Sequence, residues 1–242
     1  MDIRTTDGSG QIVIAGAGYA GLHVALRLTA KRRDDPQMAV TLVDRHDYHQ
    51  ALTELPRVAA GTRAADAVRI PLHDVLDKQV RFVQTEIDDI DVAGQQLLTG
   101  AGPISWRRLV LALGSRPNDF AIPGLAERAL QLYSVDDAER VWAAVTAALT
   151  AAAAATDPDR QRHLATVVVG GGGATGVELA GELAEMLPEA ARAHGLAPDR
   201  PAVLLVEAGP TILAGSSQKL IDKAAGILAG LGVQVCTKAT IA

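Results

Sequence analysis

The 242-residue sequence contains a single cysteine, Cys236, and therefore forms neither an intramolecular disulfide nor a CxxC pair. A disulfide framework and a redox-active dithiol are both excluded for this chain. The first ten residues, MDIRTTDGSG, also lack the apolar core of a secretory signal. We therefore expect a protein of the cytoplasm.

Aromatic side chains make up only 3 % of the residues, and the formal net charge is −5. Few rings are left to stack on bases, and no excess of positive charge faces a phosphate backbone, which argues against nucleic acid as a partner. No run of about 18 apolar residues is present, so the sequence predicts no membrane-spanning helix. A peripheral contact with a membrane stays compatible with these absences.

Histidine, cysteine and the carboxylates do not form a metal-ligand pattern either. No set of these residues has the spacing of a zinc or other transition-metal site. We expect no metal site among the six histidines, which are His23, His46, His49, His73, His163 and His194.

What the sequence does contain is typical of a folded protein with two domains. Hydrophobic residues make up 48 % of the chain, and domains cluster at roughly 100 to 150 residues. The segment RPNDFAIPGL, residues 116–125, has the composition of a connection. We therefore predict one domain over residues 1–116 and a second over residues 117–242.

The segment IVIAGAGYAGL, residues 12–22, places an apolar strand before the pattern Gly-x-Gly-x-x-Gly and an amphipathic helix after it. Gly16 permits the tight turn, Gly18 lets a diphosphate approach the backbone, and Gly21 lets helix and strand pack closely. The helix N-terminus offers free N–H groups and a partial positive charge to the diphosphate. The pattern predicts a dinucleotide site whose remaining turn residues are Ala17, Tyr19 and Ala20.

The same order recurs in VVVGGGGATGVELAG, residues 167–181, where Gly170 ends the strand. Here the motif glycines are Gly171, Gly173 and Gly176. The turn also contains Ala174 and Thr175. Two strand, turn, helix and strand units predict an α/β fold made of two Rossmann-like dinucleotide-binding units with parallel strands.

Each unit carries an acid as the last residue of its second predicted strand, Asp44 in residues 39–44 and Glu207 in residues 203–207. A carboxylate there binds the ribose hydroxyls of a dinucleotide. The interval from Gly176 to Glu207 is longer than the usual ~20 residues, and the loop AHGLAPDRPA accommodates the excess. A carboxylate at Glu207 favours the free 2′-hydroxyl of NADH over the 2′-phosphate of NADPH.

Glu178 follows two residues after the last motif glycine, on the expected first turn of the helix. From the residues alone, two interpretations stay open. Its charge either stabilises the helix N-terminus or provides a polar group beside a reacting ring.

The rest of the sequence fits around these units. Residues 47–77 carry helix and strand breakers and are expected to be irregular, and residues 80–115 predict strands of a meander that ends in a buried one. Ser134 and the acids after it predict a capped helix to about Ala155, which TDPDRQR ends. In the second unit we expect a strand at residues 166–170 and, after the glycine turn, a helix to about residue 193. A further helix is expected around residues 218–229 and a strand at residues 232–236.

These motifs resemble those of the two-dinucleotide-binding-domain flavoproteins of the pyridine nucleotide-disulfide reductase superfamily, and most of all the type II NADH:quinone oxidoreductases. The resemblance is carried by IVIAGAGYAGL, VTLVDRHDYHQALTELPRVAAGT, LVLALGSRPNDFAIPG and VVVGGGGATGVELAGELAEM. It implies an FAD-type unit followed by an NAD-type unit. It also implies hydride transfer from NADH to the flavin, with electrons passing on to a quinone or another small-molecule acceptor.

Carried over by position, the resemblance implies a set of site residues. It favours Glu178 as a catalytic glutamate near the nicotinamide and the flavin. FAD would be bound by Gly16, Ala17, Gly18, Tyr19, Ala20, Gly21, Asp44, Arg45, Ile87, Ala112, Leu113 and Gly114. NADH would be bound by Gly171, Gly173, Ala174, Thr175, Gly176 and Glu207.

The sequence also departs from parts of that superfamily. It lacks the cysteine pair of the disulfide reductases and the catalytic cysteines of the sulfide:quinone reductases. It ends at Ala242, where the relatives complete the NAD domain, return to the FAD domain and end in a segment with much of the quinone and membrane contact. We therefore expect a second unit that is incomplete at its C-terminus and a gap beside the strand in LVLALGS.

Three interpretations stay open on this basis. The chain is an FAD-dependent NADH oxidoreductase, a truncated and non-catalytic fragment that binds NADH or an adenine nucleotide, or an enzyme similar to the ferredoxin reductases of the same superfamily. A homodimer and a peripheral contact with the cytoplasmic membrane through the missing segment are left open as well.

Overall fold

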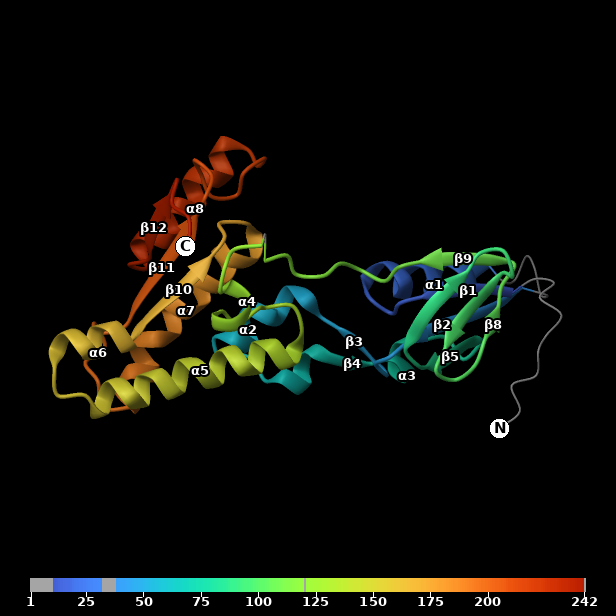
Figure 1. The fold of residues 1–242 in the computed structure, drawn as a ribbon, viewed down its shortest axis with the longest axis horizontal. Coiled ribbons are helices and arrows are strands. Elements are labelled where there is room, and N and C mark those ends of the chain that lie inside the picture. The colour runs from blue at the N-terminus through green and yellow to red at the C-terminus, as the bar shows by residue number, and fades with distance from the viewer. Residues whose placement is uncertain (1–10, 32–37, 120, 242) are drawn as a thin grey trace. The chain divides into compact units, whose positions relative to one another are not determined.

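A computed structural model of the chain describes residues 11–31, 38–119 and 121–241. It divides into two compact units (Figure 1). The first contains the described residues up to Gln50 together with Arg69–Arg116, and the second contains Ala51–Val68 together with the described residues from Pro117 onward. One division falls where the sequence predicts a domain boundary. Residues 51–68, however, belong to the second unit and not to the first.

The first unit is built on a parallel four-stranded sheet with the order β5, β2, β1, β9. The strands are β1 (Gln11–Ala15), β2 (Ala39–Asp44), β5 (Val80–Gln84) and β9 (Arg108–Leu111). Helix α1 (Tyr19–Lys31) follows β1 and precedes β2, as the sequence predicts for this unit. The sheet therefore brings the carboxyl ends of β1 and β2 side by side.

Both faces of this sheet are covered, as parallel sheets require. Ile14 and Leu42 are buried on one face, against α1 and α3 (Leu72–Val75). Val13 and Val43 are buried on the other face against an antiparallel meander. The strands of the meander are β6 (Ile87–Asp91), β7 (Gln96–Thr99) and β8 (Ile104–Ser105).

The expectation of a buried strand at the end of the meander is wrong. β9 instead leaves the meander, pairs with β1 and lies at the edge of the described parallel sheet. Its Leu111 is 60 % exposed, and Leu113 just after it is exposed as well. The reason is positional: in the part of the chain that the structure describes, only one side of β9 is hydrogen-bonded to a neighbouring strand.

Residues 47–77, expected to be irregular, form short elements. β3 (Tyr48–Gln50) and β4 (Arg69–Pro71) pair antiparallel. Between them lie η2 (Leu52–Glu54), α2 (Leu55–Ala59) and η3 (Ala65–Val68). The prolines and glycines of the segment limit the length of each element rather than preventing it.

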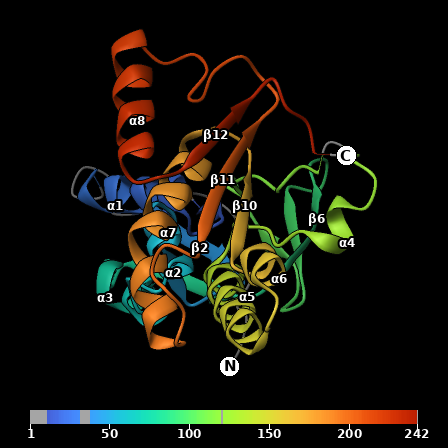
Figure 2. The same cartoon turned by 90° about the vertical axis from the view of Figure 1, so that its left-hand side faces the viewer.

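The second unit repeats the plan with a parallel sheet of β10 (Thr166–Gly170), β11 (Ala202–Glu207) and β12 (Gln234–Thr237), side by side in Figure 2. α7 (Ala174–Ala193) joins the first two strands and α8 (Gln218–Gly230) joins the last two. α4 (Leu125–Arg128), α5 (Val135–Ala154) and α6 (Pro158–Leu164) precede the sheet. The α/β class and its parallel sheets are thus confirmed.

The segment TDPDRQR ends α5 as predicted, but it also begins a helix that is not predicted from the sequence. Asp157 occupies the N-cap of α6 and accepts the N–H groups of Asp159 and Arg160 at 3.3 Å each, and Pro158 takes the first helical position. Asp at the N-cap followed by Pro at N1 is a helix start signal. The same residues that end one helix therefore begin the next.

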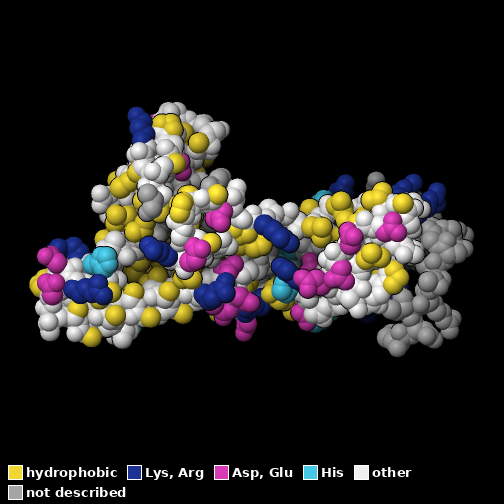
Figure 3. Space-filling view, in the orientation of Figure 1, with side chains coloured by type: hydrophobic (Ala, Val, Ile, Leu, Met, Phe, Trp, Pro, Cys, Tyr) yellow, Lys and Arg dark blue, Asp and Glu magenta, His cyan; other side chains and the backbone are white. Residues whose placement is uncertain are grey.

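Charged side chains are mixed on the surface drawn in Figure 3, where Lys and Arg alternate with Asp and Glu in small groups. This face carries no continuous basic area, in keeping with the net charge of −5. None of the helices within the described ranges is both long and apolar enough to cross a membrane.

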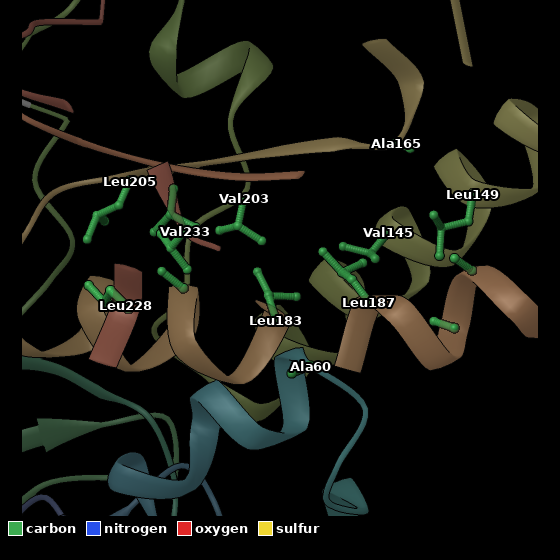
Figure 4. Packing of buried hydrophobic residues seen from close by; sticks show 14 of the residues in the cluster. Ala60, Val145, Leu149, Ala165, Leu183, Leu187, Val203, Leu205, Leu228 and Val233 are labelled. Carbon is green, nitrogen blue, oxygen red and sulfur yellow. The ribbon is translucent and has the colours of Figure 1, made fainter. Parts of the chain in front are cut away.

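The core of the second unit lies between α7, the sheet and α5. Figure 4 shows Leu183 and Leu187 of α7 among Val203 of β11 and Val145 and Leu149 of α5. Each of these side chains is almost fully buried. Alternating residues of β11 and residues three to four apart on α7 supply this contact, as the strand and helix periods require.

Residues 51–68 join this unit through specific contacts. Arg57 of α2 pairs with Glu182 of α7 across 3.2 Å, and its pKa is raised chiefly by the hydrogen bond to Glu182 and by the nearby charge of Glu54. Gly61 lies so close to the Trp142 ring of α5 that an added Cβ would come within 2.4 Å of it. These long-range partners explain why the segment leaves the unit in which its neighbours in sequence lie.

Asp137 is expected to stabilise α5 in a pH-dependent way. It forms a capping box with Ser134, accepting the Ser134 N–H at 2.8 Å. Burial raises the pKa of Asp137, but hydrogen bonds from Ser134, Arg140 and Tyr133 outweigh it and lower the pKa below 3.8. Asp137→Asn should reduce the free energy of unfolding by about 1 kcal/mol at pH 7, as loss of a cap does.

The sign of the pH dependence follows from the lowered pKa. The stabilisation is complete above the unfolded-state pKa and disappears as pH falls through the lower folded-state pKa. Urea unfolding at pH 7 and near pH 3 measures it, with Asp159→Asn on exposed α6 as the control for loss of one charge. A stability difference that stays constant between the two pH values would contradict the assignment.

Candidate dinucleotide-binding sites

The first glycine turn connects β1 to α1 with a backbone that only glycine adopts without strain. Gly16 has φ +102°, and its N–H donates to the Val43 carbonyl of β2 at 2.8 Å. A Cβ at Gly21 would lie 1.8 Å from the Gly16 oxygen, whereas a Cβ at Gly18 would meet nothing within 4 Å. The fold therefore requires glycine at positions 16 and 21.

The second turn, between β10 and α7, has the same construction. Gly171 has φ +100°, and its N–H donates to the Val206 carbonyl of β11 at 2.8 Å. A Cβ at Gly176 would lie 1.9 Å from the Gly171 oxygen, and a Cβ at Gly173 would again meet open space. In neither unit does the packing require glycine at the middle glycine of the motif, Gly18 or Gly173. The absence of a side chain there leaves room for a ligand to approach the backbone.

The acids that end the second strands contact these turns directly. Asp44 accepts the Ala17 N–H at 2.6 Å and the His46 N–H at 2.8 Å. Glu207 accepts the Gly172 N–H at 2.6 Å and the Gly209 N–H at 2.5 Å. In both units the carboxylate thus joins the middle of the glycine turn to the residue two positions after itself.

Glu207 is held in its charged form by these contacts. The backbone N–H of Gly209 lowers its pKa most, that of Gly172 lowers it further, and burial opposes them without reversing the shift from 4.5. Hydrogen bonds to a carboxylate favour its ionised form. The site therefore presents a negative charge at neutral pH beside the second glycine turn.

The helix N-termini after the turns are open to solvent. Gly18, Tyr19 and Ala20 are exposed at the start of α1, and Gly173, Ala174 and Thr175 are exposed at the start of α7. Neither helix has an acid in its first turn. The start of each helix, with the positive end of its dipole, is therefore accessible to an anion such as a diphosphate.

Glu178 lies in the second turn of α7 and not in the first, which corrects the expectation from the sequence. The helix begins at Ala174, so Glu178 is its fifth residue, and its side chain is exposed. The helix dipole acts mainly on charges in the first turn. Stabilisation of the helix N-terminus is therefore a weaker explanation for a glutamate at position 178 than the sequence suggests.

The remaining predicted residues of the first site have different surroundings. Ala112 packs against Gly16 and Gly21 and donates its N–H to Ala15 at 2.8 Å. Gly114 has φ +77°, so the chain turns just after β9. Ile87 packs in the apolar layer with Val13, Val43 and Leu97, and Arg45 is exposed, with its guanidinium 3.9 Å from Glu86. The structure thus brings Ala112 to the turn and gives Ile87 a packing role.

Two residues next to the turns are absent from the sequence predictions. His49 Nδ1 lies 2.9 Å from the Ala17 carbonyl, and the Leu213 N–H donates to the Gly172 carbonyl at 2.7 Å. In the sequence, His49 is considered as a metal ligand and lies in a segment that carries the family resemblance, but it is not predicted as a site residue. A backbone donor such as Leu213 leaves no signal in the side-chain pattern. Within the described ranges, no group of three or more His, Cys, Asp or Glu could hold a metal ion.

The fold and the turns define an α/β protein with parallel sheets typical of Rossmann-like FAD and NAD domains. The pyridine nucleotide-disulphide oxidoreductase family matches residues 10–242, and the chain belongs to this family. That match covers both glycine turns and both carboxylates.

Particular relatives add detail. The chain is 32 % identical over 225 residues to a type II NADH:quinone oxidoreductase of Staphylococcus saprophyticus, which covers 93 % of this chain and 55 % of the relative. The structure of NDH2 from Plasmodium falciparum in complex with NADH is similar in fold, with a TM-score of 0.83, 22 % identity and coverage of 94 % and 48 % of the two chains. The structure of the sulfide:quinone oxidoreductase of Aquifex aeolicus is also similar in fold, with a TM-score of 0.74 and 19 % identity. The chain spans about half the length of the curated relatives it matches.

The close packing at the third motif glycine predicts a sharp contrast between two glycines of α7. Gly176→Ala should reduce the free energy of unfolding by about 1–3 kcal/mol, because its Cβ would overlap the Gly171 carbonyl. Gly181→Ala is the matched control: its Cβ would come no closer than 4.0 Å to Leu228, and alanine favours the helix. Urea unfolding of both variants measures the contrast, and equal stabilities would contradict the packing argument.

Proposed function

We propose that the chain holds FAD at its first glycine turn and NADH at its second, as part of an oxidoreductase that oxidises NADH. The repeated construction of turn, carboxylate and open helix N-terminus supports this proposal most strongly. Gly18 and Gly173 carry the argument, because the fold has space for a side chain at both positions. Contact between a diphosphate and the backbone at these two positions would explain why each unit has glycine there.

The chain's own residues perform the binding and orientation. In the proposal, the exposed N–H groups at the starts of α1 and α7 hold the diphosphates, and Asp44 and Glu207 hold the ribose hydroxyls. Both carboxylates keep lone pairs beyond the two N–H groups that each accepts. Bound FAD would supply the redox chemistry, accepting a hydride from NADH and passing electrons to an acceptor.

The acceptor is proposed to be a quinone. The staphylococcal relatives at 32 % identity are named NADH:quinone oxidoreductases, and the fold is similar to that of a sulfide:quinone oxidoreductase. We assign the FAD-binding role to residues 1–116, apart from the segment 51–68 that packs in the second unit, and the NADH-binding role to residues 117–242.

A visible spectrum of the purified chain tests this proposal directly. Bound flavin absorbs in the blue, and anaerobic addition of NADH should bleach that band, followed by its return on addition of a soluble quinone. NADPH at the same concentration is the control and should bleach it more slowly. A colourless protein that takes up no added FAD but still binds NADH would contradict the proposal and support a nucleotide-binding chain without catalysis.

The charge of Glu207 is expected to set the choice of nicotinamide cofactor. Glu207→Gln removes the negative charge that faces a 2′-phosphate, and the ratio of the NADPH to the NADH dissociation constant should fall roughly tenfold, about 1.4 kcal/mol. Fluorescence titrations with both cofactors measure the ratio. Asp44→Asn, which changes the equivalent acid of the other unit, should leave it unchanged. A shift with Asp44→Asn but not with Glu207→Gln would reverse the assignment of the two sites.

Glu178 is proposed as the catalytic glutamate beside the reacting rings, because it is exposed on α7 and lies beyond the first turn. Glu178→Gln should lower the rate of flavin reduction by NADH roughly tenfold or more, with the free energy of unfolding unchanged. Glu185→Gln is the matched control, since Glu185 is exposed two helical turns further along α7. Equal rates for the two variants in stopped-flow measurements would remove Glu178 from the reaction.

A further inference from the structure

The backbone of Ala17, in the middle of the first glycine turn, is hydrogen-bonded through both its N–H and its carbonyl oxygen. Its N–H donates to Asp44 Oδ2 at 2.6 Å, and its carbonyl oxygen lies 2.9 Å from His49 Nδ1. A carbonyl oxygen only accepts hydrogen bonds, so the contact requires a proton on Nδ1 of His49. The position of this proton is thereby assigned from the partner.

The second unit fixes the backbone of the corresponding residue, Gly172, with a different donor. The Gly172 N–H donates to Glu207 Oε2 at 2.6 Å, and the Gly172 carbonyl accepts the backbone N–H of Leu213 at 2.7 Å. Both donors follow the carboxylate closely in the chain: His49, on β3, comes five residues after Asp44, and Leu213 comes six residues after Glu207. Two units with different sequences thus supply a donor to the equivalent carbonyl, which indicates that the orientation of the peptide after the middle residue matters in both.

The surroundings of His49 hold its ring in one orientation. The residue is only 4 % exposed and lies on β3, where it pairs with Ile70 of β4. Tyr19, the first residue of α1, contacts the imidazole edge to face, with ring centroids 4.7 Å apart and an angle of 88° between the planes. Packing and strand pairing therefore aim Nδ1 at the turn.

We propose that His49 is a positioning residue of the first dinucleotide site. Its Nδ1–H holds the Ala17 carbonyl, in the peptide that leads to Gly18, while Asp44 holds the Ala17 N–H, in the peptide before it. Together they keep the backbone of residues 18–20 in the orientation that receives the FAD diphosphate. His49 needs no change of charge for this role, because Nδ1 remains a donor when the ring is protonated. The inference rests on the FAD-binding role proposed for this turn.

Substitution of His49 by residues with amide side chains distinguishes the contributions of its two ring nitrogens. The Asn amide nitrogen reaches the position of Nδ1, the Gln amide nitrogen reaches further toward the position of Nε2, and Leu removes both. The measurement is the FAD dissociation constant of the flavin-free chain, from quenching of flavin fluorescence, with the NADH dissociation constant as an internal control. His49→Gln and His49→Leu should weaken FAD binding roughly tenfold, because the released turn must be ordered again by the ligand.

The conservative variant gives the decisive comparison. His49→Asn should keep FAD binding within about threefold of the unsubstituted chain, and all three variants should bind NADH normally. Wild-type affinity for FAD in the Gln and Leu variants would overturn the inference, as would an Asn variant as weak as the Leu variant. If His49→Leu fails to fold, the Asn and Gln variants still decide between the two ring positions.

A second measurement needs no flavin. Nitrogen-15 spectra of the neutral imidazole should show the proton of His49 on Nδ1. A proton on Nε2 would overturn the inference whatever the flavin measurements show. Failure of the unsubstituted chain to bind FAD would instead contradict the proposed function of the turn, and with it the role of His49 toward that ligand.

Discussion

The hydrogen bond from the glycine turn to the acid at the end of the next strand is the contact on which each unit depends. Ala17 donates to Asp44 in the first unit and Gly172 donates to Glu207 in the second, both at 2.6 Å. The bond ties the loop after one strand to the loop after its neighbour. It fixes the direction in which the following helix begins and places a carboxylate beside an open helix N-terminus, so that attraction for a diphosphate and for ribose hydroxyls arises in one place.

That bond is available only because the two strands are parallel and in a particular register. Ala15 pairs with Val43 and Gly170 pairs with Val206, so each turn starts level with the end of the second strand. Burial on both faces of the first sheet, and of α7 against the second, holds these strands in place. The hydrophobic core thus holds both turns and their carboxylates in place.

The sequence alone predicts much of this arrangement, because its strongest signals are local. Gly16 and Gly21, like Gly171 and Gly176, stand where the backbone and the packing allow little else, and β2 and β10 have the predicted bounds. Contacts between residues far apart in the chain are not predicted from the sequence. The Trp142 contact of Gly61 and the pairing of Arg57 with Glu182 place residues 51–68 in the second unit. His49 belongs to no sequence motif that predicts its role, because only the folded structure brings it to Ala17.

Exchanging the open glycine of each turn tests most directly whether the two turns are separate sites of one construction. Gly18→Ala and Gly173→Ala should both fold with unchanged stability, because an added Cβ meets nothing within 4 Å at either position. Calorimetric titrations of the flavin-free chain should show that Gly18→Ala weakens FAD binding by roughly tenfold or more and leaves NADH binding intact. Gly173→Ala should do the reverse. Variants that bind both ligands as the unsubstituted chain does, or that lose both together, would contradict the two-site account.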